Sequence, residues 1–107
     1  MTPTACIVLC ACPGPEVART IAETLVSERL AACVSRVDGM VSLFRWQGAL
    51  EQADESLLLV KTTSARYPAL ETRLRQLHPY DVPEILALPL LAGSAPYLDW
   101  LAAETAE

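Results

Sequence analysis

The chain is short of basic residues and has a single histidine. Eight lysines and arginines stand against thirteen aspartates and glutamates, so the formal net charge is −5. Proteins that bind nucleic acid or an anionic membrane need clustered Lys and Arg to displace counterions. We therefore expect neither nucleic acid nor a membrane surface as a partner.

Long hydrophobic runs are missing as well. No apolar stretch approaches the roughly 20 residues that a membrane-spanning helix needs. The start of the chain, Met1 to Thr4, lacks the basic region and the longer apolar segment of a secretory signal. The sequence thus predicts a cytoplasmic protein. A length of 107 residues fits one domain with a sizeable core, so we expect a single domain over residues 1–107.

Motifs typical of enzymes are also absent. The chain has no glycine-rich phosphate loop and no two-histidine metal motif. Its single histidine, His78, does not complete the chain order of a Ser–His–Asp triad. A dyad of Cys10 and His78 is the one catalytic pairing left open. Iodoacetamide labelling with a measured thiol pKa would separate such a nucleophile from a structural cysteine. We expect a protein that is not an enzyme.

Four cysteines are present, and three of them, Cys6, Cys10 and Cys12, occupy even positions of one apolar run. Side chains two apart on a strand share a face but are poorly placed to bridge one another, so we expect reduced thiols. Cys10 and Cys12 form a Cys-x-Cys, and two thiolates in that arrangement suit a soft ion such as Cu(I). Packing in the core is the expected role of Cys6 and Cys33.

Changes of hydrophobic period divide the chain into six elements and a terminal helix. In chain order we expect a strand at 5–12, a helix from 15 to about 30, strands at 33–46 and 49–63, a helix at 65–77, a strand at 84–90 and a short helix at 96–103. Gln47-Gly48 suits a hairpin tip, and Gly39 suits a bulge. The order βαββαβ favours an α+β, ferredoxin-like sandwich with a four-stranded antiparallel sheet and both main helices on one face.

The two central strands are too long for a monomer of this size. A usual strand has about five or six residues, whereas these two run over residues 33–46 and 49–63. A domain this small has a radius of gyration of about 13 Å, so the hairpin that the two strands form must protrude beyond it. Isolated two-stranded ribbons are marginal in water. The apolar side chains near the tip are Val41, Leu43, Phe44 and Trp46. An identical chain in a closed ring is the simplest cover for them, and we expect an obligate homo-oligomer.

The segment from His78 to Glu84 forms a stiff polar corner. Pro79 and Pro83 fix their own φ and push the preceding residues toward extended geometry, so the preceding helix cannot continue. The corner gathers an imidazole, a phenol and two carboxylates at the mouth of a strand. Either a ligand binds there or another subunit packs there.

Six segments, in order and at consistent spacing, resemble the CutA family of divalent-cation tolerance proteins. They are Val8-Leu9-Cys10, Leu30-Ala31-Ala32-Cys33-Val34, Trp46-x-Gly48 with Glu51 and Glu55, Lys61-Thr62-Thr63, His78-Pro79-Tyr80-x-x-Pro83-Glu84 and Tyr97-Leu98-x-Trp100-Leu101. The resemblance implies a ferredoxin-like homotrimer with the shape of the trimeric PII signalling proteins. It further implies a link to tolerance of copper and other divalent metals, without established catalytic activity.

The resemblance also implies a copper ligand set of Cys10 and Glu84, completed by a histidine. In members with two successive histidines before the Pro-Tyr, the first is the proposed ligand, and that position is Leu77 here, so only His78 remains. A fourth donor must come from Cys12, water or a neighbouring subunit. We therefore expect weak binding of Cu or another divalent ion through Cys10, His78 and Glu84. For His78 itself, the role of a hydrogen-bonded spacer before the proline is slightly favoured over that of a ligand.

A further group suits a cleft or an interface: Trp46, Glu51, Glu55, Lys61, Tyr80, Tyr97 and Trp100. The two tryptophans either wall a ligand cleft or pack between subunits, and packing is the expected role. Lys61, with the glutamates at 51, 55 and 84, either binds a small carboxylate or phosphate between subunits or forms an ion pair across strands. The leading function is thus trimeric metal tolerance, and the alternative is a PII-like trimer that binds a small anion at subunit clefts.

Overall fold

A computed structural model describes residues 4–107, which form one four-stranded antiparallel sheet and three helices. The elements are β1 (Ala5–Cys12), α1 (Pro15–Ser27), β2 (Cys33–Trp46), β3 (Ala49–Thr63), α2 (Tyr67–Leu77), β4 (Ile85–Pro89) and α3 (Ala95–Glu104). The strand order is β2-β3-β1-β4. The α+β class and the order of elements are as predicted. Residues 1–3, on which the prediction of no secretory signal partly depends, lie outside the described residues.

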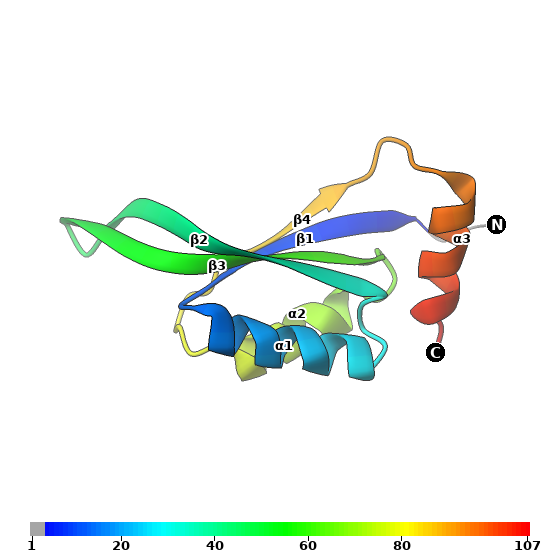
Figure 1. The fold of residues 1–107 in the computed structure, drawn as a ribbon, viewed down its shortest axis with the longest axis horizontal. Coiled ribbons are helices and arrows are strands. Elements are labelled where there is room, and N and C mark those ends of the chain that lie inside the picture. The colour runs from blue at the N-terminus through cyan, green and yellow to red at the C-terminus, as the bar shows by residue number, and fades with distance from the viewer. Residues whose placement is uncertain (1–3) are drawn as a thin grey trace.

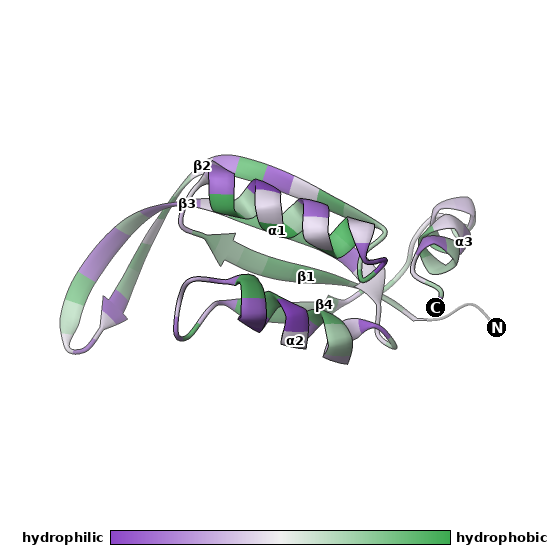
Figure 2. Ribbon diagram, turned by 90° about the horizontal axis from the view of Figure 1, so that it is seen from below, coloured by the Kyte–Doolittle hydropathy of each residue, from purple (hydrophilic) through white to green (hydrophobic). Residues whose placement is uncertain are grey.

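The two longer helices, α1 and α2, cover one face of the sheet, while α3 lies at the end of the sheet near the N-terminus (Figure 1). The even positions of β1 point toward α1 and α2, and the core lies in this layer. Its buried side chains include Val8, Cys10, Ile21, Leu25, Leu58, Val60, Leu70 and Leu74. Figure 2 shows the same layer from the helix side. Within residues 4–107, no helix is both long and apolar enough to cross a membrane.

The other face of the sheet carries neither α1 nor α2, and most of its side chains are apolar. Strand residues alternate between faces, and Leu9 pairs with Leu59 on one side and with Leu86 on the other, so the three share this face. By the same register the face also carries Cys33, Ser35 and Lys61 toward its α3 end. We call its apolar residues the open face: Ile7, Leu9, Val37, Leu57, Leu59, Leu86 and Leu88. Leu86 and Leu88 are 53% and 47% exposed, so no element within residues 4–107 covers this apolar surface.

The hairpin of β2 and β3 projects well beyond the helices (Figure 1). Its strands have 14 and 15 residues, and the molecule measures 48 × 26 × 22 Å. The predicted bulge is present, because the register shifts between Val37 and Met40 and Gly39 has a φ of 79°. At the tip, Gln47 and Gly48 both have positive φ, as a two-residue turn of type I′ requires. The length and the turn chemistry predicted for this hairpin are confirmed.

Helix α1 ends at Ser27, three residues before the predicted end. The N–H of Leu30 donates to the carbonyl of Leu25, and the N–H of Arg29 donates to that of Val26, each at 3.0 Å. Arg29 has a φ of 60°, so this is a Schellman ending with arginine in the left-handed position that glycine usually takes. The apolar periodicity continues into Leu30, which explains why the sequence predicted a longer helix.

Strands β1, β2 and β3 have the predicted bounds, while those of α2, β4 and α3 differ from prediction by one or two residues. Helix α2 begins at Tyr67 rather than at residue 65, after a turn in which the N–H of Arg66 donates to the carbonyl of Thr63. Strand β4 covers residues 85–89 rather than 84–90.

Arg29 also donates from its guanidinium to the carbonyl oxygens of Ala103 and Ala106, which holds the end of α3 against α1.

Candidate functional site

The corner after α2 is fixed by the ring of His78, which is 6% exposed. Its Nε2 lies 2.7 Å from the carbonyl oxygen of Ala11, at the end of β1. A carbonyl only accepts, so Nε2 carries the hydrogen. The other nitrogen, Nδ1, accepts from the N–H of Tyr80 at 3.1 Å. The imidazole is therefore held as the Nε2–H tautomer, and both of its nitrogens are engaged.

Two buried thiols adjoin this ring. Cys10 and Cys12 lie side by side on the helix-facing side of β1, and their sulfur atoms and the ring of His78 form a group whose candidate ligand atoms all lie within 4.8 Å of one another. A hydrogen bond to Cys12 raises the pKa of the Cys10 thiol, and burial and the charges of Cys12, Glu84 and Glu55 add to this effect. The thiol of Cys10 therefore keeps its proton.

This group fits a soft metal ion only in part. Two thiols are ligands that soft ions prefer. His78, however, becomes a ligand only if it gives up one of its two hydrogen bonds. Glu84 is exposed and does not belong to the group, although its charge acts on Cys10. Of the three expected ligands, the structure thus brings Cys10 and His78 together. It also places Cys12 beside them. The Cys-x-Cys spacing was the sequence signal for Cys12, which the sequence offered only as a supplementary donor.

A cavity of about 680 Å³ opens between the projecting hairpin and the corner. Its lining is aromatic and acidic: Ala11, Ser42, Leu43, Phe44, Trp46, Glu51, Gln52, Glu55, Tyr80, Asp81, Val82 and Glu84. The carboxylate of Glu55, 8% exposed, accepts a hydrogen bond from the hydroxyl of Tyr80 at 3.2 Å. Burial raises the pKa of Tyr80, and the charge of Glu55 raises it further. Four of the cleft candidates, Trp46, Glu51, Glu55 and Tyr80, thus share one cavity.

The other three cleft candidates lie at the α3 end of the sheet. Lys61 donates from Nζ to the hydroxyl of Ser35, and its Nζ lies 3.9 Å from the sulfur of Cys33. The rings of Tyr97 and Trp100 pack with centroids 5.5 Å apart. Burial raises the pKa of Tyr97, and Cys33 adds to this through its charge and a hydrogen bond.

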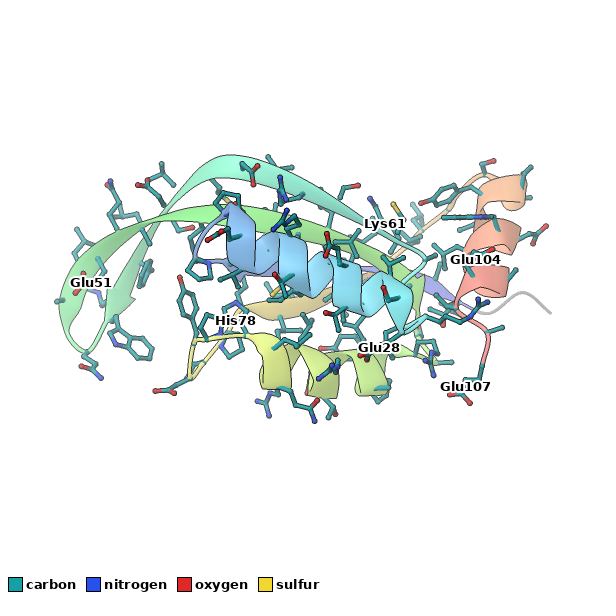
Figure 3. The ribbon with its side chains drawn as sticks, turned by 60° about the horizontal axis from the view of Figure 1, so that its bottom comes forward. Glu28, Glu51, Lys61, His78, Glu104 and Glu107 are labelled. Carbon is teal, nitrogen blue, oxygen red and sulfur yellow. The ribbon has the colours of Figure 1, made fainter. Side chains whose placement is uncertain are left out.

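Of the two interpretations of Lys61 with the glutamates, the ion pair across strands is not formed within one chain. Lys61 pairs across the sheet with Ile7 and Cys33, and it lies six positions beyond Glu55 on β3, or about 20 Å at about 3.3 Å per residue. In Figure 3 the labelled Lys61 and Glu51 are far apart. Trp46 and Trp100 are likewise separated, since the hairpin tip and α3 lie at opposite ends of the molecule (Figure 1). One chain alone does not wall a cleft with both tryptophans.

Residues 6–104 match the family model described as CutA1 divalent ion tolerance protein. The chain belongs to this family. It is 56% identical over 99 residues to the divalent-cation tolerance protein CutA of Thermus thermophilus, covering 92% of this chain and 96% of that one. It is 43% identical over 90 residues to the human protein CutA, but spans only 50% of that protein's length.

Solved structures of family members have the same fold. The divalent cation tolerance protein of Thermus thermophilus superposes with a TM-score of 0.93 at 54% identity, over 95% of this chain and 99% of that one. A protein from Archaeoglobus fulgidus, described as a periplasmic divalent cation tolerance protein CutA, also gives a TM-score of 0.93, at 31% identity and the same coverage. The fold described above is therefore that of CutA proteins.

Proposed function

We propose that this chain acts as a closed homotrimer in the tolerance of divalent cations, copper above all, through weak metal binding or metal response in the cytoplasm. The observation that carries the proposal is the match over residues 6–104 to a family named for divalent ion tolerance, together with a relative of that name that the chain covers almost completely. The four free cysteines agree with a reducing compartment.

Two surfaces support assembly. The open face is apolar and uncovered, and the hairpin carries exposed apolar side chains, with Leu43 65% and Trp46 46% exposed. Surfaces of this kind mark contacts with other proteins, and a second copy is always available. The strand order and the two helices on one face agree with a ferredoxin-like sandwich, the fold that the resemblance implied for each subunit of a trimer.

The donors at the end of β1 support weak metal binding. We assign ligation to Cys10, with Glu84 and His78 as the further expected ligands and Cys12 within reach. A bound ion must displace thiol protons and release His78 from Ala11 or from Tyr80. Both costs reduce the affinity, so binding is weak and becomes weaker as the pH falls.

Neither a small anion nor catalysis is favoured by the local chemistry. The residues that line the cavity include four carboxylates and no Lys, Arg or His, so a carboxylate or phosphate is repelled there. The Cys10–His78 dyad is also unsuited to nucleophilic attack, because Cys10 has a raised pKa and neither nitrogen of His78 is free to accept its proton.

Titration calorimetry with Cu, Zn and a nucleotide panel, combined with sedimentation equilibrium, tests the proposal. We expect a stable trimer, weak heats with the metals and none with the nucleotides. A stable monomer at micromolar concentration would refute the assembly. Saturable nucleotide binding without metal binding would instead support the PII-like alternative.

A further inference from the structure

Cys10 and Cys12 form a pair of thiols that solvent does not reach. Both are 0% exposed, and both belong to the core between the sheet and the helices α1 and α2. They are two residues apart on β1, so their side chains leave the same face of the strand. With the ring of His78, their candidate ligand atoms all lie within 4.8 Å of one another. The two sulfur atoms are therefore close enough to share one ion.

The nitrogen and oxygen donors near this pair are less available than the thiols. Both nitrogens of His78 are engaged, Nε2 with the carbonyl oxygen of Ala11 and Nδ1 with the N–H of Tyr80. Glu84 is exposed and stands outside the group. Glu55 also stands outside it, and its carboxylate accepts a hydrogen bond from the hydroxyl of Tyr80. The site thus offers two soft donors and no disengaged hard one.

This donor set does not suit the divalent ions for which the family is named. Zn(II) in structural sites is almost always four-coordinate, and Cu(II) favours a tetragonal set of nitrogen and oxygen ligands. For either ion, His78 would have to break a hydrogen bond and a further donor would have to enter the core. Cu(I) differs, because it is a soft ion that thiolates select and that two thiolates satisfy.

We propose that Cys10 and Cys12 form a buried dithiolate site for Cu(I), without His78 or Glu84 as ligands. Binding releases the protons of the two thiols to solvent and leaves the oxidation state of copper unchanged, so the step requires no oxidant or reductant. The core around the pair keeps water from joining as a further ligand.

The inference rests on the proposed function and deepens it. It names monovalent copper as the ion that the end of β1 prefers, and it makes Cys12 a ligand rather than a supplementary donor. Glu84 and His78 then serve only the weak binding of divalent ions. The two claims therefore depend on different residues and on different ions, and one set of titrations separates them.

The test is competition for Cu(I) between the wild-type protein and bicinchoninate under anaerobic conditions, with Zn(II) titrated in parallel by calorimetry. We expect one Cu(I) per chain and an affinity at least about a hundredfold higher than that for Zn(II). Ag(I), a soft monovalent ion that leaves thiols reduced, should displace Cu(I) from the site. An affinity for Zn(II) equal to or above that for Cu(I) would overturn the proposal.

Variants assign the ligands. Cys12→Ser should weaken Cu(I) binding at least about a hundredfold and leave the weak Zn(II) binding in place, whereas Glu84→Gln should do the reverse. Cys6→Ser, at another buried position on the same face of β1, is the matched control and should change neither. Unchanged Cu(I) binding in Cys12→Ser, or equal loss in Cys6→Ser, would overturn the proposal.

The two ions also separate this inference from the proposed function. Cu(I) binding by a wild-type protein that binds no Zn(II) would support the dithiolate site and refute only the divalent part of the proposed function. Weak Zn(II) binding without Cu(I) binding would overturn the dithiolate site and leave the proposed function standing.

A measurement on the wild type alone keeps the test independent of how the variants fold. Cu(I) is diamagnetic and His78 is the single histidine of the chain, so NMR follows its ring directly. We expect the Nε2–H tautomer of His78 to persist when Cu(I) is bound, and X-ray absorption to show sulfur as the nearest neighbour of copper. Nearest neighbours of nitrogen or oxygen, or a loss of that tautomer on loading, would overturn the proposal.

Discussion

The Nε2–H of His78 donates a hydrogen bond to the carbonyl oxygen of Ala11 at 2.7 Å, and it joins the corner after α2 to the end of β1. The two residues are 67 positions apart. The same ring accepts from the N–H of Tyr80, whose hydroxyl reaches Glu55 in the cavity. His78 is thus the structural link between the thiol group of β1 and the cavity under the hairpin.

This role predicts the effect of His78→Phe. The variant keeps an aromatic ring but removes both hydrogen bonds and leaves buried polar groups of the backbone unpaired. We expect a loss of about 1–3 kcal/mol in the free energy of unfolding, measured by urea denaturation. Gln76→Ala, at an exposed position in the last turn of α2, is the control. A His78→Phe variant as stable as the wild type would show that the ring does not support the corner.

Local sequence signals were sufficient for the elements of the fold. The apolar periods predicted the strands and helices, Gly39 predicted the bulge, and Gln47-Gly48 predicted the turn. Each of these features depends on residues that are neighbours along the chain. Helix α1 ends earlier than its apolar period predicts because Arg29 takes a left-handed conformation that usually requires glycine. A residue type that can adopt the conformation only at a cost gives no sequence signal for it.

The candidate site was predictable only where alternation along a strand sufficed. Cys10 and Cys12 share a face because they are two residues apart, and the structure places them so. The contacts of the corner were not predictable, because side chains in a turn do not follow a repeating direction. Nothing in the sequence therefore indicated that Tyr80 contacts Glu55. The ion pair of Lys61 with the glutamates is not formed within one chain for a simpler reason, because Lys61 lies six positions, or about 20 Å, beyond Glu55 along β3.

The hairpin provides a test of assembly. Trp46→Ala should cost about 3 kcal/mol or more per site if neighbouring subunits bury this side chain, which is enough to loosen the trimer. Leu91→Ala, at a fully exposed position between β4 and α3, is the matched control. Sedimentation equilibrium across a range of concentrations would detect the dissociation. Trp46→Ala and wild type with identical association constants would exclude the tip from the interface.

The cysteines predict that the fold does not depend on the redox state of the solution. All four are free thiols, and burial of apolar surface in the proposed trimer is the alternative source of stability. The melting temperature should therefore be the same with and without dithiothreitol, as calorimetry or circular dichroism would show. A fall of many degrees on adding the reductant would mean that a disulfide supports the protein.

Tyr67 predicts a loss of stability at high pH. Burial, followed by its hydrogen bond to Glu71, raises the pKa of Tyr67 to about 12. The folded state favours the protonated phenol, and this adds to the free energy of unfolding. The added stability is fully present below the unfolded pKa of about 10 and is lost as the pH rises through about 12. In a Tyr80→Phe, Tyr97→Phe background, ultraviolet absorbance should show tyrosinate forming near pH 12, and Glu71→Gln should lower that midpoint. An ordinary midpoint near 10 would disprove the burial of the hydroxyl.

Metal binding at the end of β1 is the central claim, and calorimetric titration of three proteins with Cu and Zn tests it most directly. The proteins are the wild type, Cys10→Ser and, as the matched control, Cys33→Ser. The account predicts weak binding by the wild type and by Cys33→Ser, and none by Cys10→Ser. Equal loss of binding in both variants, or no binding by the wild type at millimolar metal, would contradict it.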